Sequence, residues 1–303
     1  MSRANAPPRW QAELALAFVA LVWGSTFVVV KSALTDISTV YFLALRFSLA
    51  AFCMLLMFWP SFRSSNGAAI RKGLAGGGIA GIFLWLGYVL QTFGLKYTTA
   101  GKSGFITGFY IALVPLLGAA LYRRWPPARE LLGIAVATAG IAILTLPRGN
   151  RFVMNRGDLL TIGCAIAFAI HLLVLGYYSQ RCLVSAVALG QIACSAVLST
   201  ISLAWERPSA IWNRNVLFAL TLTAIFATAL AFAIQTWGQK YTSPSRTALI
   251  FALEPVFALA TAVSVGREAL TAAALAGGAL VLAGILLVEL KPKPRTQLEQ
   301  VEN

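Results

Sequence analysis

Charged side chains are scarce in this sequence. Only 11% of its 303 residues are Asp, Glu, Lys or Arg, compared with about 25% in soluble globular domains, and 59% are hydrophobic. The loops between the apolar runs are mostly short, so they leave no room for a separate soluble domain. This composition excludes an ordinary soluble protein and indicates a protein embedded in a membrane.

Histidine and cysteine are also rare. The chain has 1 His and 4 Cys, without a CxxC pair or a Cys/His spacing, which argues against a zinc site and a disulfide framework. No GxxxxGK[ST] phosphate loop occurs, so this chain does not hydrolyse ATP. We expect no metal and no cofactor. The net charge of +14 comes from basic residues scattered through the loops, so we expect no nucleic-acid partner either.

About ten runs of roughly twenty apolar residues fill the chain instead. The hydrocarbon core of a bilayer is about 30 Å thick and needs about 20 apolar residues per helix. Backbone polar groups in lipid must be satisfied within the segment, so such runs predict helices. The sequence predicts an all-α integral membrane protein with ten transmembrane helices. The predicted spans are 13–31, 38–59, 70–93, 103–122, 130–147, 158–178, 183–204, 216–237, 247–265 and 271–290.

The charges of the loops predict the orientation. With ten spans, both termini lie on one side, and the loops on that side carry more Lys and Arg than the opposite loops. This bias places both termini in the cytoplasm, although the loop from Arg148 to Arg156 argues the other way. The first run is too long for a signal-peptide core and shows no clear A-x-A site. We expect a multi-pass protein of the bacterial plasma (inner) membrane, with cytoplasmic tails at 1–12 and 291–303.

The chain contains two copies of one unit. QTFGLKYT at residues 91–98 recurs as QTWGQKYT at 235–242. Each copy, residues 13–147 and 158–290, carries five predicted spans, and this odd number turns the second copy upside down relative to the first. Two inverted repeats around a site at the midplane are an architecture of secondary transporters.

Four features of the sequence stand out as motifs: WGSTFVVVK at 23–31, the lone Arg46, the stretch Tyr-Thr-x-x-x-x-Ser-Gly-Phe-Ile at 97–106, and ALEP at 252–255. Together they resemble the EamA branch of the drug/metabolite transporter superfamily. The resemblance covers nearly the whole chain and implies ten helices, cytoplasmic termini, a central cavity, and export or sometimes uptake of small metabolites such as amino acids. Phe168, where the family often has Trp, and Gln191, at the repeat position of Arg46, depart from the pattern. We therefore expect functionally unequal halves.

Each ionisable side chain within a span needs a reason, because charge is costly in a bilayer. Glu254 stands before Pro255 in the ninth span; it could bind a substrate amine, carry a proton, or form a structural ion pair. Arg46 could be its partner, bind a substrate carboxylate, or snorkel, and is interpreted as a structural intramembrane charge. His171 is a second candidate for proton coupling, against a simple hydrogen bond between helices.

Aromatic and polar residues at helical spacing predict the wall of a cavity, with helix packing as the alternative. The predicted substrate-binding residues are Trp23, Thr26, Trp85, Tyr88, Gln91, Thr107, Tyr110, Gln235, Phe251 and Glu254. Glycines recur every four residues and predict close helix contacts at Gly73, Gly77, Gly81, Gly104 and Gly108.

The sequence thus predicts a secondary transporter for a small-molecule substrate, an exporter of metabolites such as amino acids, that works by alternating access with proton exchange. The alternative is an integral membrane enzyme acting on a lipid-soluble substrate. Against it stand the single histidine, the few carboxylates, and the lack of paired acids or a metal cluster. A channel is disfavoured because nothing repeats as a filter. A homodimer stays open.

Overall fold

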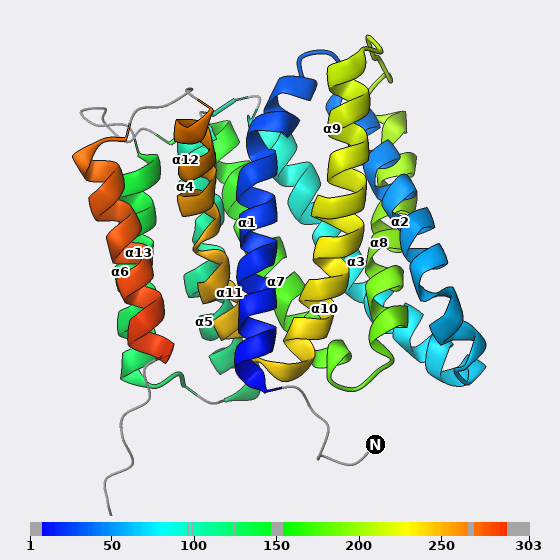
Figure 1. Cartoon of the computed structure of the whole chain (residues 1–303), viewed down its shortest axis with the longest axis horizontal. Coiled ribbons are helices and arrows are strands. Elements are labelled where there is room, and N and C mark those ends of the chain that lie inside the picture. The colour runs from blue at the N-terminus through cyan, green and yellow to red at the C-terminus, as the bar shows by residue number, and fades with distance from the viewer. Residues whose placement is uncertain are drawn as a thin grey trace, which may run out of the picture.

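The computed structural model describes residues 8–95, 97–98, 100–123, 125–146, 154–265 and 270–289. These residues form a bundle of long helices that lie side by side (Figure 1). In chain order the helices are α1 Arg9–Ala33, α2 Thr39–Arg63, α3 Gly67–Leu95, α4 Ala100–Gly108, α5 Tyr110–Tyr122, α6 Ala128–Thr145, α7 Arg156–Ser179, α8 Val184–Ile201, the 3₁₀ turn η2 Ser202–Ala204, α9 Arg214–Ala224, the π-helix η3 Ile225–Leu230, α10 Ala231–Tyr241, α11 Pro244–Phe251, α12 Glu254–Ser264 and α13 Ala272–Glu289.

The helices have the length and composition that a bilayer requires. In the described part of the chain, 8 helical segments are long and apolar enough to cross a membrane, and they coincide with the second to ninth predicted spans. Helix α1 covers the first predicted span, and the shorter apolar α13 covers the tenth. Large apolar side chains such as Phe52, Leu56 and Leu275 point outward and are more than half exposed, as a surface in contact with lipid tails would be. The prediction of an all-helical, multi-pass membrane protein is confirmed.

Several membrane-crossing segments are broken near their middle, which the sequence analysis did not predict. The segment of α4 and α5 is interrupted at Phe109, whose N–H bonds to Ile106 O at the tighter i−3 spacing. The segment of α11 and α12 is interrupted at Leu253, whose N–H bonds in the same way to Ile250 O. Pro255 explains the second break, because it has no N–H to continue the ladder of hydrogen bonds. The two breaks stand at the same position of the repeated unit.

A third irregularity joins α9 to α10. The six residues of η3 adopt the wider π-helical spacing, and the Thr228 hydroxyl bonds to Thr223 O over a distance of 2.9 Å. Such π-helical turns leave backbone carbonyls free for other partners and frequently occur at functional sites.

Small residues hold two helix pairs close together. Gly77 on α3 lies so near α8 that an added Cβ would stand 2.2 Å from Val187 O, and Gly73 and Gly81 make similar contacts. The prediction of close packing at these three glycines is confirmed. It was wrong for Gly104, where an added Cβ would meet nothing within 4 Å, and Gly108 makes only ordinary contacts.

The second close pair is α6 with α13. An added Cβ on Gly133 would stand 2.6 Å from Gly284 O, and one on Gly140 would stand 2.7 Å from Gly277 O. The two helices therefore run in opposite directions, and Figure 1 shows them together at one edge of the bundle. The start of α1 and the end of α13 lie at the same end of the bundle, opposite the α1–α2 connection (Figure 1).

Candidate functional site

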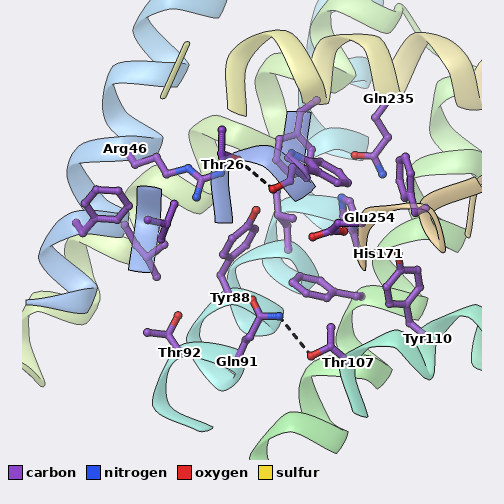
Figure 2. Close-up of a pocket in the computed structure, with 18 of the residues that line it drawn as sticks. Thr26, Arg46, Tyr88, Gln91, Thr92, Thr107, Tyr110, His171, Gln235 and Glu254 are labelled. Atoms are coloured by element: carbon purple, nitrogen blue, oxygen red, sulfur yellow. Dashed lines mark hydrogen bonds between the residues drawn. The ribbon is translucent and has the colours of Figure 1, made fainter. Parts of the chain in front are cut away.

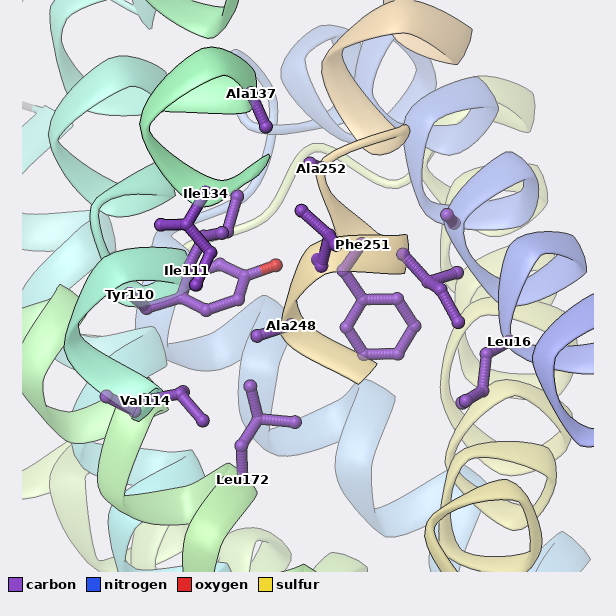
Figure 3. Packing of buried hydrophobic residues seen from close by; sticks show 14 of the residues in the cluster. Leu16, Tyr110, Ile111, Val114, Ile134, Ala137, Leu172, Ala248, Phe251 and Ala252 are labelled. Atoms are coloured by element: carbon purple, nitrogen blue, oxygen red, sulfur yellow. The ribbon is translucent and has the colours of Figure 1, made fainter. Parts of the chain in front are cut away.

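A cavity of about 180 Å³ lies in the middle of the bundle, among α1, α2, α3, α7, α10 and the broken helices (Figure 2). On one side it reaches Val30, Leu34 and Thr39, beside the α1–α2 connection. On the other side Tyr110 and Phe251 separate it from a packed apolar cluster. Figure 3 shows this cluster, with Leu16, Val114, Leu172 and Ala248 around the two aromatic rings. The cavity is therefore closed toward the end of the bundle where α1 begins and α13 ends.

Most of the predicted site residues meet in this cavity. The predicted residues that line it are Trp23, Thr26, Tyr88, Gln91, Thr107, Tyr110, Gln235, Phe251 and Glu254, and Arg46 and His171 line it as well. Trp85 does not: its Nε1 donates to Ser202 Oγ over 3.2 Å, and its ring lies beside Trp205. Three residues along an α-helix advance by about 300°, which is about 60° less than a full turn. Two such steps separate Trp85 from Gln91, so their side chains point in directions about 120° apart.

Arg46 enters the cavity from α2 and is held by the irregular turn η3. Its Nε donates to Thr228 Oγ1 over 2.7 Å, and its Nη2 donates to Ala227 O over 3.3 Å. The guanidinium carbon also lies 5.5 Å from the centre of the Tyr88 ring, within range of a cation–π contact. These contacts position the guanidinium without neutralising it, because no carboxylate pairs with Arg46 in the described part of the chain. The ion pair with Glu254 that the sequence left open is not formed.

Glu254 stands at the first position of α12, directly after the break. Within the described residues, its carboxylate has no ion pair and no side-chain hydrogen bond, and it faces the cavity. A half-helix that begins here presents its N-terminal dipole to the carboxylate, which favours negative charge. Figure 2 shows Arg46 and Glu254 on opposite sides of Tyr88. The cavity therefore holds a guanidinium group and a carboxyl group that do not pair with each other.

A series of buried hydrogen bonds holds the His171 ring in place. Its Nε2 lies 2.8 Å from Gln191 Oε1. The Gln191 amide donates to Thr236 Oγ1 over 2.9 Å, and the Thr236 hydroxyl donates to Phe232 O over 2.6 Å. Gln191 and Thr236 are fully buried. The sequence analysis did not predict this series of hydrogen bonds, because its residues are contributed by α7, α8 and α10.

Two related glutamines also reach the cavity. Gln91 donates to Thr107 Oγ1 over 3.3 Å. Gln235 points its Nε2 toward Gln239 Oε1, at 3.5 Å, while Gln239 Nε2 donates to Leu172 O over 3.0 Å. Gln235 Oε1 is buried and has no hydrogen-bond partner among the residues that the structure describes.

Aromatic rings form the rest of the wall. Trp23 packs against Phe251 at a centroid distance of 4.9 Å and against Phe232 at 5.3 Å, and its Nε1 donates to Ala227 O over 2.8 Å. On the Arg46 side, Tyr88 packs edge-on against Phe168 at 5.6 Å. Phe168 was absent from the predicted site, although its repeat equivalence to Trp23 was a signal that could have found it. Among the described residues, no group of His, Cys, Asp and Glu has the arrangement of a metal site.

The cavity, its separated charges and its membrane setting define a protein that binds a small molecule within a bilayer. The EamA-like transporter family matches the chain twice, over residues 10–146 and 155–290. A protein of Archaeoglobus fulgidus described as an uncharacterized transporter is 35% identical over 93% of this chain and 87% of its own length. A protein of Salmonella typhimurium described as a probable amino-acid metabolite efflux pump is 26% identical over 89% of this chain and 91% of its own.

A solved crystal structure shares the fold, with a TM-score of 0.77 and 19% identity over 98% of this chain and 100% of that one. The chain belongs to the EamA-like transporter family, within the drug/metabolite transporter superfamily that the sequence motifs indicated. It is therefore a membrane transporter of small molecules and not an enzyme.

Proposed function

We propose that this chain is a secondary transporter that exports small metabolites such as amino acids, by alternating access and in exchange for protons. The observation that carries the proposal is the pair of separated, uncompensated charges in one intramembrane cavity, Arg46 and Glu254. A buried charge without a partner is unfavourable unless a ligand completes it. An amino acid carries a carboxylate that complements Arg46 and an ammonium that complements Glu254. The efflux-pump name of the Salmonella relative agrees with this class of substrate.

The proposed architecture is ten helices in two inverted five-helix repeats, residues 13–147 and 158–290. The family matches each half separately, with a boundary between residues 146 and 155. The glycine contacts of α6 with α13 support the inversion. When each residue is replaced by its repeat equivalent, the contact of Gly133 with Gly284 becomes the contact of Gly277 with Gly140, which is also present. Equivalent helices that pack antiparallel in this way are what a two-fold axis in the membrane plane produces.

The shape of the cavity supports alternating access. It reaches the α1–α2 end of the bundle and is closed by the packed cluster toward the other end. At that closed end, Arg246 Nη1 at the start of α11 lies 3.4 Å from Glu13 Oε1 near the start of α1. With the termini in the cytoplasm, as the charge bias of the loops predicts, this state faces outward. Opening inward then requires α1 and α11 to separate and the Glu13–Arg246 contact to break.

Glu254 and His171 are the proposed proton carriers. A proton and a substrate ammonium compete for the same carboxylate, so binding of one favours release of the other. That competition couples export to proton entry provided that the cavity changes its exposure only while one of the two cations is bound. We place the protein in a bacterial plasma membrane; a homodimer stays a prediction.

Reconstitution into liposomes tests the proposal. Purified protein should take up a labelled amino acid with saturable kinetics, show counterflow against an unlabelled internal pool, and respond to an imposed pH gradient. A channel would show neither saturation nor counterflow. Failure of every amino acid in a panel, in vesicles where the folded protein is verified, would refute the proposed substrate class.

A further inference from the structure

We infer that Glu254, His171 and Gln235 together form a subsite for a primary ammonium group, which uses all three of its N–H donors. This inference rests on the proposed function and specifies how one end of its substrate is recognised. Figure 2 shows the three side chains on the side of the pocket away from Arg46. They come from α12, α7 and α10 and all line the cavity.

The first step concerns the direction of the hydrogen bonds behind His171. The Thr236 hydroxyl uses its only proton on Phe232 O, so its oxygen accepts the bond from Gln191. The amide nitrogen of Gln191 therefore faces Thr236, and its oxygen faces His171. Because an amide oxygen has no proton, His171 Nε2 must carry the hydrogen of this bond. The neutral ring then has its lone pair on Nδ1, which has no hydrogen-bond partner in the described part of the chain.

The second step concerns Gln235. Gln239 donates from Nε2 to Leu172 O, so its Oε1 faces Gln235 and can only accept. Gln235 accordingly turns its Nε2 toward Gln239 and keeps its Oε1 free, although the side chain is only 1% exposed. A buried acceptor without a partner is destabilising, so a donor on a bound ligand is favourable at this oxygen.

Both series of buried hydrogen bonds end at a main-chain carbonyl, of Phe232 in one and of Leu172 in the other. Because a carbonyl can only accept, it fixes the donor and the acceptor of every bond in its series. As a result, each series of hydrogen bonds leaves an unused acceptor on a residue that lines the cavity: Nδ1 of His171 and Oε1 of Gln235. With the Glu254 carboxylate, the subsite offers acceptors and no side-chain donor from these three residues. The rings of Trp23 and Phe251 lie beside it, and their faces favour a cation.

This chemistry distinguishes degrees of substitution at nitrogen. An R–NH₃⁺ group satisfies three acceptors, whereas a trimethylammonium group of the same charge satisfies none of them through hydrogen bonds. Aromatic rings and a carboxylate alone would accept both. The subsite therefore selects primary amines over fully methylated amines of the same skeleton.

The experiment uses the full chain in lipid nanodiscs, with a purification tag that contains no histidine. Since the chain has a single His, ¹⁵N-histidine labelling reports His171 alone. The probes are 2-phenylethylammonium and its N,N,N-trimethyl derivative. We expect the unliganded protein at neutral pH to show the tautomer protonated on Nε2. We expect 2-phenylethylammonium to shift the Nδ1 resonance saturably, and the trimethyl derivative to bind at least about tenfold more weakly and leave Nδ1 unshifted.

Two variants complete the test. Gln191→Leu should weaken 2-phenylethylammonium binding about tenfold by releasing the imidazole, and Gln235→Leu should do the same. Ser199→Ala, at another buried position of α8, should leave the affinity unchanged. A neutral ring protonated on Nδ1, or equal binding of the two probes, would overturn the subsite. These results do not depend on transport, so a failed flux assay with a positive titration would refute only the proposed function.

Discussion

The two repeats contribute equivalent positions to the cavity wall, but the side chains at these positions differ in charge. The repeat equivalents are Trp23 and Phe168, Thr26 and His171, Arg46 and Gln191, Tyr88 and Phe232, Gln91 and Gln235, Thr107 and Phe251, and Tyr110 and Glu254. All of these except Gln191 line the cavity. The shared features are aromatic rings, a glutamine in each half, and a helix break at Phe109 in one half and at Leu253 in the other.

The charges break this symmetry. The first half supplies Arg46, whose equivalent is the neutral Gln191, and the second half supplies Glu254, whose equivalent is the neutral Tyr110. Matching scaffolds suit two bodies that rock against each other, while unequal side chains suit a substrate with different ends. A ligand that bridges Arg46 and Glu254 also bridges the two halves, so its binding and their relative movement are linked.

The largest expected effect contrasts Glu254 with Tyr110. Glu254→Gln should reduce proton-driven transport to the level of empty liposomes, because the amide cannot gain and lose a proton. Substrate exchange should survive at higher substrate concentration, since exchange needs only the loaded carrier to reorient. The variant should unfold at the same temperature as the parent, because Glu254 forms no ion pair with any other described residue. Tyr110→Phe, the matched change in the other half, should retain proton-driven transport; full coupling in a stable Glu254→Gln protein would contradict the assignment.

A smaller effect is expected at Arg46. Arg46→Gln removes the bonds to Thr228 and Ala227 O, which should lower the free energy of unfolding by about 1–3 kcal/mol. It should also weaken binding of an amino acid about tenfold or more, while binding of the matching amine without a carboxylate changes little. Titrations of both ligands measure this difference. Arg46→Lys keeps the charge but not the forked geometry of the guanidinium, so its affinity for the amino acid should lie between those of the parent and of Arg46→Gln. An equal loss for both ligands would mean that Arg46 is only structural.

The smallest effect is expected at the closed end. Glu13→Gln removes a partly exposed contact with Arg246 and the contact of Glu13 with Arg9 on the same helix. Only the contact with Arg246 joins α1 to α11, and such contacts contribute about 0.2–1 kcal/mol. The balance between outward and inward states should therefore shift by no more than about fivefold, toward the inward state. Accessibility of a cavity cysteine from the cytoplasmic side measures the shift. The triple variant Arg9→Glu, Glu13→Arg and Arg246→Glu reverses the charges of both contacts and should restore the original balance. A shift toward the outward state in Glu13→Gln would mean that this contact is not part of the gate.

Hydrophobic length alone predicted the membrane-crossing helices, and the spans agree with the described helices to within a few residues. Most cavity residues were also predictable, because polar side chains in lipid are costly and face the protein interior. The wrong assignment of Trp85 came from treating steps of three residues as one face. The break at Phe109 has no adjacent proline that would have predicted it. The bond of Arg46 to Thr228 depends on a π-helical turn. The hydrogen bonds from His171 to Phe232 join separate helices. Such features depend on tertiary contacts that one sequence does not reveal.

The most direct test of the central claim is the accessibility of the cavity from each side of the membrane. Gln91→Cys and Gln235→Cys, each in a background without native cysteines, are labelled with an impermeant thiol reagent in vesicles of known orientation. The account predicts that both sites react from the outer face, that an amino-acid substrate protects them, and that turnover makes them reactive from the inner face as well. Leu282→Cys, on an outward-facing surface of α13, is the inert control. If both cavity sites stayed as inert as Leu282→Cys from either side, the cavity would not be a transport pathway.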